Sequence, residues 1–162
     1  MSYDPSNKIQ NYVHNVDTSF TKKVISTSVE YYPGTEITYT PMSNASKVIY
    51  ECNLQVSADP DAAATYLNTR LQYSDDNGSS WNDINGTKLF EGSNSGTSYD
   101  QRWGIFYWIF SLDTWSGERK LRLAGRSQST SREGTLGRSY NANATEGVGS
   151  CPHVSIYSVM WR

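Results

Sequence analysis

One segment with strict period-two alternation constrains the fold most: residues 47–57 read KVIYECNLQVS. Successive side chains of a β-strand point to opposite faces, so Val48, Tyr50, Cys52, Leu54 and Val56 share one face. The residues between them are mostly polar and share the other face. This pattern predicts a strand with one face in a hydrophobic core and one face mainly in water.

The rest of the chain repeats the same pattern. Clusters of Gly, Ser, Asn and Thr separate short apolar segments with period two, which is typical of all-β proteins. Further strands are expected at 28–41, 65–73, 81–89, 102–112, 119–126 and 153–161. The single helix signal is DPDAAA at 59–64, where Asp59 can cap a turn and Pro60 can begin it.

Composition excludes several classes of protein. A chain of 162 residues with a net charge of −2 is about one domain long and has no overall positive field to attract nucleic acid or anionic membranes. Two cysteines, expected to stay unbonded, and two histidines in no ligand spacing predict no metal and no cofactor. The N-terminus has no signal-peptide pattern, so we expect a product made soluble in the cytoplasm, without membrane insertion.

Two segments lack strand alternation. Residues 1–26 scatter apolar side chains among polar ones, and we interpret them as an arm that anchors the protein to a partner, with a frayed terminus as the alternative. The remainder, 27–162, is expected to form the folded domain, and its segment 127–152 is too long for an ordinary hairpin connection. The anchoring residues of the arm are expected to be Ile9, Tyr12, Val13, Val16 and Phe20.

The stretch LQYSDDNGSSWNDI at 71–84 contains the spacing S-x-D-x-G-x-x-W, which resembles the Asp-box of sialidase propellers. A propeller needs several repeats, and this sequence has one copy. In a hairpin, Asn and Gly supply the positive φ angles of the turn, and the Asp accepts bonds from turn amides. We therefore assign Ser74, Asp76, Gly78 and Trp81 to a structural turn.

No residues assemble into a convincing active site, so we expect no enzyme activity. Candidate acids lie in turn-like contexts, where carboxylates usually bond their own backbone. Cys52 faces the core, and Cys151 with His153 lies in no nucleophile motif. The acids considered are Asp59, Asp61, Asp75, Asp76 and Asp83.

The segment WGIFYWIFSL at 103–112 is apolar on both faces. One face carries Trp103, Ile105, Tyr107 and Ile109, and the other carries Phe106, Trp108, Phe110 and Leu112. A sandwich strand normally has one wet face, so the second must be covered by the long loop or by another subunit. We expect a subunit interface, formed by Phe106, Trp108, Phe110, Tyr157 and Trp161.

Three motifs carry a family resemblance: I-x-Y-T-P at 37–41, S-K-V-x-Y-E at 46–51, and the aromatic last strand HVSIYSVMW. Together they resemble the small jelly-roll structural proteins of tailed bacteriophages, which include head-decoration proteins and tail-fibre tips. The resemblance implies an antiparallel jelly-roll β-sandwich of tumour-necrosis-factor-like topology that forms a homotrimer. It also implies pairing of 47–57 with 153–161.

Two functions follow from this resemblance. The first is a virion structural protein that decorates the capsid and binds the major capsid protein or another virion protein. The alternative is a tail-fibre or head-fibre tip that binds a host surface glycan. The contacts for such a ligand are expected in a locally basic region and comprise Arg126, Arg132, Arg138 and Tyr140. The alternative interpretation of this region is a strand face that is simply exposed to solvent.

Overall fold

The computed structural model describes residues 8–18, 23–58, 64–87, 89–94, 103–128, 134–136 and 151–160. Every regular element within these ranges is a β-strand, which confirms the all-β prediction. Residues 59–63 of the expected helical turn lie outside the described part, and Ala64 begins a strand. The strands are β1 (Lys8–Val16), β2 (Lys23–Ile25), β3 (Glu30–Tyr31), β4 (Ile37–Tyr39), β5 (Lys47–Ala58), β6 (Ala64–Ser74), β7 (Asn82–Asp83), β8 (Leu89–Asn94), β9 (Trp103–Leu112), β10 (Arg119–Ser127), β11 (Gly134–Leu136) and β12 (His153–Met160).

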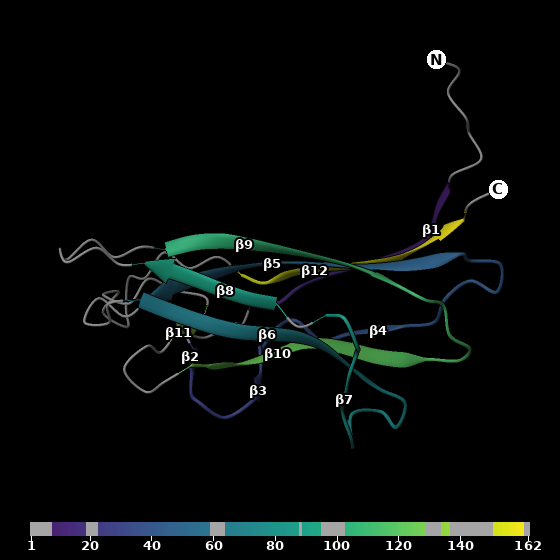
Figure 1. Cartoon of the computed structure of the whole chain (residues 1–162). Coiled ribbons are helices and arrows are strands. Elements are labelled where there is room, and N and C mark those ends of the chain that lie inside the picture. Colours follow the sequence, from purple (N-terminus) through teal and green to yellow (C-terminus); the bar gives the residue numbers. More distant parts are fainter. Residues whose placement is uncertain are drawn as a thin grey trace, which may run out of the picture.

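The strands form two antiparallel sheets that lie face to face (Figure 1). Sheet A has the order β1-β12-β5-β11-β2, with β9 paired to the other side of β5. Sheet B has the order β3-β10-β6-β7, with β4 also on β10 and β8 also on β6. Strands β12 and β11 pair with successive stretches of β5, so β5 is the central strand of sheet A.

The chain passes repeatedly between the sheets, from β1 and β2 in sheet A to β3 and β4 in sheet B, then to β5, to β6–β8, to β9, to β10 and back to β11 and β12. This order is that of a jelly-roll β-sandwich, as predicted. The expected pairing of the 47–57 and 153–161 strands is also confirmed, from Lys47↔Val159 to Asn53↔His153.

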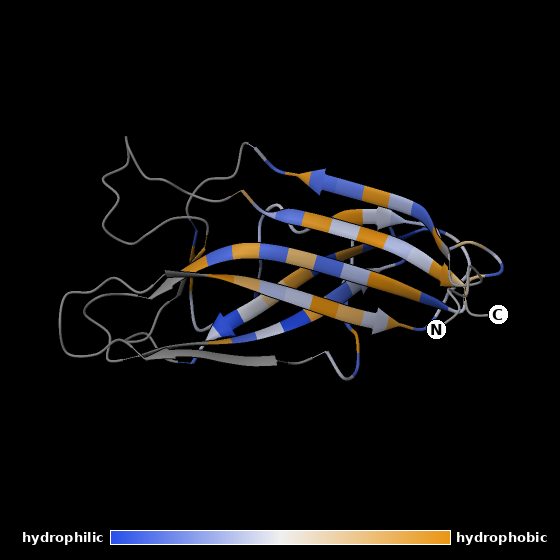
Figure 2. Ribbon diagram, turned by 90° about the horizontal axis from the view of Figure 1, so that it is seen from above, coloured by the Kyte–Doolittle hydropathy of each residue, from blue (hydrophilic) through white to orange (hydrophobic). Residues whose placement is uncertain are grey.

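The core lies between the inner faces of the two sheets. All five inward residues of β5 identified by alternation are buried, and the Tyr50 ring lies 6.3 Å from that of Phe110. Sheet B contributes mainly leucines from β6 and β10. Figure 2 shows the underlying pattern, with apolar and polar bands alternating along the strands. The period-two alternation therefore sets which residues form this core.

Buried hydroxyl groups join the two layers across the core. Tyr39 Oη of sheet B lies 2.8 Å from Ser158 Oγ of sheet A. Tyr50 Oη of sheet A donates to the backbone oxygen of Thr35, and Thr35 Oγ1 accepts from the backbone N–H of Leu123 in sheet B. Since buried polar groups need partners, these bonds fix how one sheet lies on the other.

The expectation of a separate N-terminal arm is wrong for its described residues. Strand β1 pairs with β12, and β2 pairs with β11, so both belong to sheet A. Ile25 is fully buried in the core, and Val13 packs against it. The strand escaped detection because the register shifts between Gln10 and Val13, which breaks the alternation. Phe20 lies outside the described residues.

Cys52 and Cys151 are not joined by a disulfide. Cys52 is fully buried on the inner face of β5, and burial raises the pKa of its thiol to about 12. Its neighbour on β12 is Val154, so Cys151 lies beyond the position opposite Cys52. The register therefore separates the two thiols, as the sequence predicts.

Gly125 of β10 offers a test of the packing between β10, β3 and β6. A Cβ at this position would overlap Tyr32 Oη and lie 2.7 Å from the backbone oxygen of Asn68. We expect Gly125→Ala to lower the free energy of unfolding by about 1–3 kcal/mol, measured by chemical denaturation. The cost should be smaller in a Tyr32→Phe background, which removes the closest atom. An equal cost in both backgrounds would contradict this packing.

Candidate functional site

The candidate site is the outer face of sheet A, which faces away from the core. Ile105, Tyr107 and Ile109 of β9 point outward and are 59%, 57% and 55% exposed. These three side chains belong to an ordered strand that pairs with β5 over its whole length. Large apolar groups that stay exposed on a regular strand are typical of an interaction surface.

The prediction that Phe106, Trp108 and Phe110 of β9 form an interface is wrong, because these side chains lie on the inner face of the strand. Trp108 and Phe110 are 2% and 7% exposed and lie in the core, and Phe106 packs partly against it. The cause is the register, which places Trp108 beside Cys52 and Phe110 beside Tyr50, both on the inner face of β5. Alternation separates the two sets of side chains, but when both are apolar it does not say which set faces inward.

The exposed apolar surface continues across the sheet to β1, where Ile9 and Tyr12 are 62% and 57% exposed. Between the two edges lie the half-buried side chains of Ile49, Tyr157 and Val159. Tyr157 is thus on this face, as its assignment to an interface requires, whereas Trp161 lies outside the described residues. The outer face of sheet A therefore combines the β9 stripe, the middle of β5 and β12, and the exposed end of β1.

Glu51 lies among tyrosines near the middle of this face. Tyr157 Oη donates a 2.8 Å hydrogen bond to Glu51 Oε1. Burial, together with the bond to Glu51 and its negative charge, raises the pKa of Tyr157 to about 12. Burial and Glu51 also raise the pKa of Tyr107, and the Tyr12 ring stacks on Tyr157 at 6.0 Å. The sequence pattern predicts no role for Glu51, which is a lone acid between Tyr50 and Cys52.

Several other polar groups of the face have partners. Ser155 Oγ lies 2.9 Å from both Tyr12 Oη and His14 Nδ1, and the His14 and His153 rings are 5.8 Å apart. Lys47 forms an ion pair with Asp113 at the end of β9. The charges described on this face are thus few and mostly paired. An apolar surface of another molecule can therefore pack against it without burying unpaired charges.

The Asp-box residues form the structural turn that the sequence predicts. Asn77 and Gly78 have φ angles of 58° and 94°. Ser74 Oγ accepts from the Gly78 N–H, and Asp76 accepts from the N–H and hydroxyl of Ser80. These bonds lower the pKa of Asp76 to about 2. Trp81 Nε1 donates to the Gly78 oxygen, which closes the turn.

The predicted basic ligand contacts do not form a site among the described residues. Arg126 is exposed on β10, opposite Asn68 of β6. Its neighbours on β10 are engaged elsewhere, since Arg119 pairs with Asp75 and Arg122 lies 3.7 Å from the centre of the Trp81 ring. Arg132, Arg138 and Tyr140 lie outside the described part of the chain.

The acids considered for catalysis also have structural partners. Asp75 pairs with Arg119, and Asp83 pairs with Arg70 and accepts from Gln72. Asp59 and Asp61 fall outside the described residues. Within the described ranges, no group of three His, Cys, Asp or Glu side chains is placed to hold a metal ion. The same ranges contain no helix of the length and apolarity that a membrane span requires.

Comparison with known proteins gives no family for this chain: no family model and no curated protein matches the sequence. Similar solved structures include the dimeric latent PorU of Porphyromonas gingivalis, at 10% identity and a TM-score of 0.41, with 94% of this chain and 13% of that one covered. Another is the Eiger TNF of S. frugiperda, at 8% identity and a TM-score of 0.34, with 85% and 90% covered. A CocE/NonD family hydrolase of Staphylococcus aureus has 10% identity and a TM-score of 0.26, with 95% and 35% covered.

The Glu51 cluster generates a prediction about tyrosine ionisation. In Glu51→Gln the negative charge beside Tyr157 is lost, so the pKa of Tyr157 should fall from about 12 toward the ordinary value of 10.0 while staying above it, because burial remains. NMR titration of tyrosines labelled at the Cζ carbon measures the change, with Tyr157→Phe to assign the signal. Glu36→Gln, which changes a residue just before β4 that pairs with Lys120, is the matched control and should leave this pKa unchanged.

Proposed function

We propose that this chain is a non-enzymatic structural protein that assembles into a homotrimer through the outer face of sheet A. The observation that carries the proposal is the exposed stripe of Ile105, Tyr107 and Ile109 on β9. Burying a large apolar side chain that is otherwise in water is worth about 1.5–3 kcal/mol. Three such groups in a row give a strong reason for association.

The occupant that fits this face is a second copy of the same chain. Each copy carries the same stripe, and closed rotational symmetry buries one such patch per subunit without growth into fibres. The apolar surface reaches from β9 across β5 and β12 to Ile9 and Tyr12 on β1. Because it extends across the sheet, one copy can present β9 and its neighbour can present another part of the same face around a three-fold axis.

We further propose that the trimer is a component of a tailed-phage virion, where it decorates the capsid by binding the major capsid protein. The support for this role is the sequence resemblance at 37–41, 46–51 and the last strand. The jelly-roll order of the sheets agrees with that resemblance at the level of the fold. A tail-fibre or head-fibre tip is the alternative role, and the copy number on the particle distinguishes the two.

Tyr107→Glu tests the self-association face. A charge in the middle of an interface would be buried without a partner, so the variant should be a folded monomer near 18.2 kDa, whereas the unmodified chain should have three times that mass. Light scattering coupled to size exclusion measures both. Tyr31→Glu is the matched control, since Tyr31 is 48% exposed on sheet B, beside Lys23 and Arg122. It should remain a trimer.

A monomeric mass for the unmodified chain would remove the trimer proposal. Loss of the trimer in Tyr31→Glu but not in Tyr107→Glu would place the interface on sheet B instead. Circular dichroism of both variants shows whether a change in mass reflects dissociation or unfolding.

The virion role is tested on particles produced from the genome that encodes this chain. Quantitative mass spectrometry of purified particles should find the protein at a copy number comparable to that of the major capsid protein, because a decoration protein covers the whole shell. A few copies per particle would point to a fibre tip, and absence from the particles would contradict both roles.

A further inference from the structure

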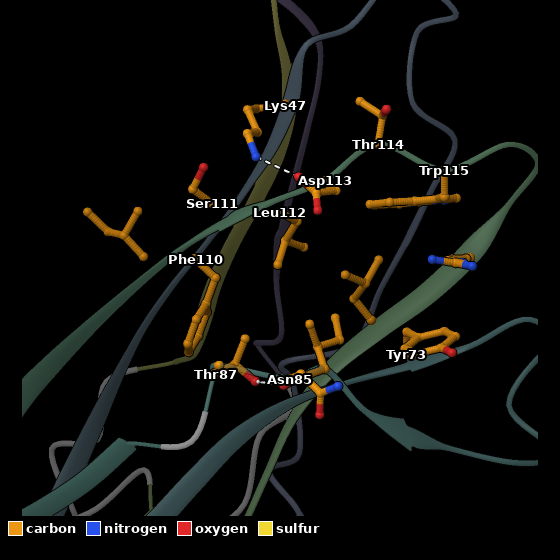
Figure 3. A pocket seen from close by; sticks show the side chains of 15 residues that line it. Lys47, Tyr73, Asn85, Thr87, Phe110, Ser111, Leu112, Asp113, Thr114 and Trp115 are labelled. Carbon is orange, nitrogen blue, oxygen red and sulfur yellow. Dashed lines mark hydrogen bonds and ion pairs between the residues drawn. The ribbon is translucent and has the colours of Figure 1, made fainter.

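A cavity of about 700 Å³ opens at one side of the sandwich. It lies where β9 ends and the chain turns toward β10, opposite the turn that follows β7 (Figure 3). Its volume falls in the range of about 300–1,000 Å³ that is usual for small-molecule pockets. No sequence motif predicts this cavity, because its lining comes from separate segments of both sheets.

The interior of the cavity is apolar and aromatic. Phe110 and Leu112 of β9 supply one wall, and Tyr73 and Trp115 supply aromatic rings from β6 and the β9–β10 connection (Figure 3). The guanidinium of Arg119 lies 4.5 Å from the centre of the Tyr73 ring and 5.3 Å from that of Trp115. These contacts hold the two rings in fixed positions at the cavity wall.

The rim is polar, but its charges are compensated. Lys47 Nζ lies 2.5 Å from Asp113 Oδ1, and Arg119 Nε donates to Asp75 Oδ1. The exposed side chain of Asn85 also lines the opening (Figure 3). An anionic ligand would therefore have to compete with a carboxylate already bonded to each of these two cations.

One buried donor in the cavity wall lacks a partner. Trp115 Nε1 is shielded from solvent, and no described residue accepts a hydrogen bond from it. Because this atom is shielded from solvent, a ligand in the open cavity would contact the Trp115 ring rather than its N–H.

From these features we infer that the cavity binds a neutral saccharide ring. The C–H face of a sugar packs on aromatic rings, while its hydroxyl groups donate to and accept from groups such as the Asn85 amide and the Asp113 carboxylate. A purely apolar ligand would leave this polar rim unsatisfied. An acidic sugar or a phosphate is disfavoured, because Lys47 and Arg119 are each already paired with a carboxylate.

This inference does not depend on the proposed trimer. Tyr107 lies on the outer face of sheet A and does not line the cavity, although Ile109 and the Lys47–Asp113 pair border both surfaces. The monomeric Tyr107→Glu variant should therefore keep its ability to bind sugar. Failure of one proposal can thus be distinguished from failure of the other.

The test is an NMR titration of the full chain with methyl glycosides of glucose, galactose, mannose and N-acetylglucosamine, and with glucuronic and N-acetylneuraminic acid as anionic comparators. At least one neutral glycoside should shift the Trp115 indole N–H signal in a saturable way, with Trp115→Phe used to assign that signal. Asn85→Ala should weaken binding about tenfold or more, the loss expected for a hydrogen bond to a ligand hydroxyl. Asn82→Ala, an exposed Asn of β7 outside the cavity lining, is the control and should bind normally.

Three outcomes would overturn the inference. One is the absence of any saturable shift at about 50 mM of each neutral glycoside, far above the ~1 mM range of weak sites. The second is a shift of equal affinity in Asn85→Ala and in the unmodified chain. The third is binding of the acidic sugars alone, which would assign an anion site to the cavity.

Discussion

The pairing of β5 with three other strands is the constraint on which the rest of the structure depends. One side of β5 holds β12 and β11, which in turn hold β1 and β2, and the other side holds β9. Every other residue of β5 from Val48 to Val56 is buried between the sheets. Both terminal segments of the described chain are therefore fixed in sheet A by a single strand from the first half of the sequence.

The same register decides what the protein exposes. With Trp108 opposite Cys52, one set of β9 side chains enters the core and the other set, including Tyr107, must face outward. A slip of one residue would exchange the two sets, so the core and the proposed interface are two results of one pairing. Around Glu51 the outer face then gathers tyrosines whose hydroxyl groups keep a carboxylate hydrogen-bonded within a largely apolar surface.

Strand β9 links the two proposed functions. Its outward side chains form the stripe through which we propose that copies associate, and its last residues begin the wall of the cavity. Ile109 belongs to both, since it is exposed on the outer face and also lines the cavity opening. A trimer built on this face would place three sugar sites at equivalent positions around its axis, which favours multivalent contact with a repeated glycan.

The sequence by itself determined the strands with clean alternation, the inward residues of 47–57, the β5–β12 pairing implied by resemblance, and the turn built on Ser74 and Asp76. Apart from the pairing, these features depend on local periodicity and local hydrogen bonds, which involve residues close together in the chain. Only the tertiary structure decided that β1 belongs to the sheet, which face of β9 is inside, and that Tyr73, Asn85 and Trp115 meet at one cavity. Each of these depends on contacts between segments far apart in the chain, and where a strand is apolar on both faces or carries a bulge, its own pattern does not contain that information.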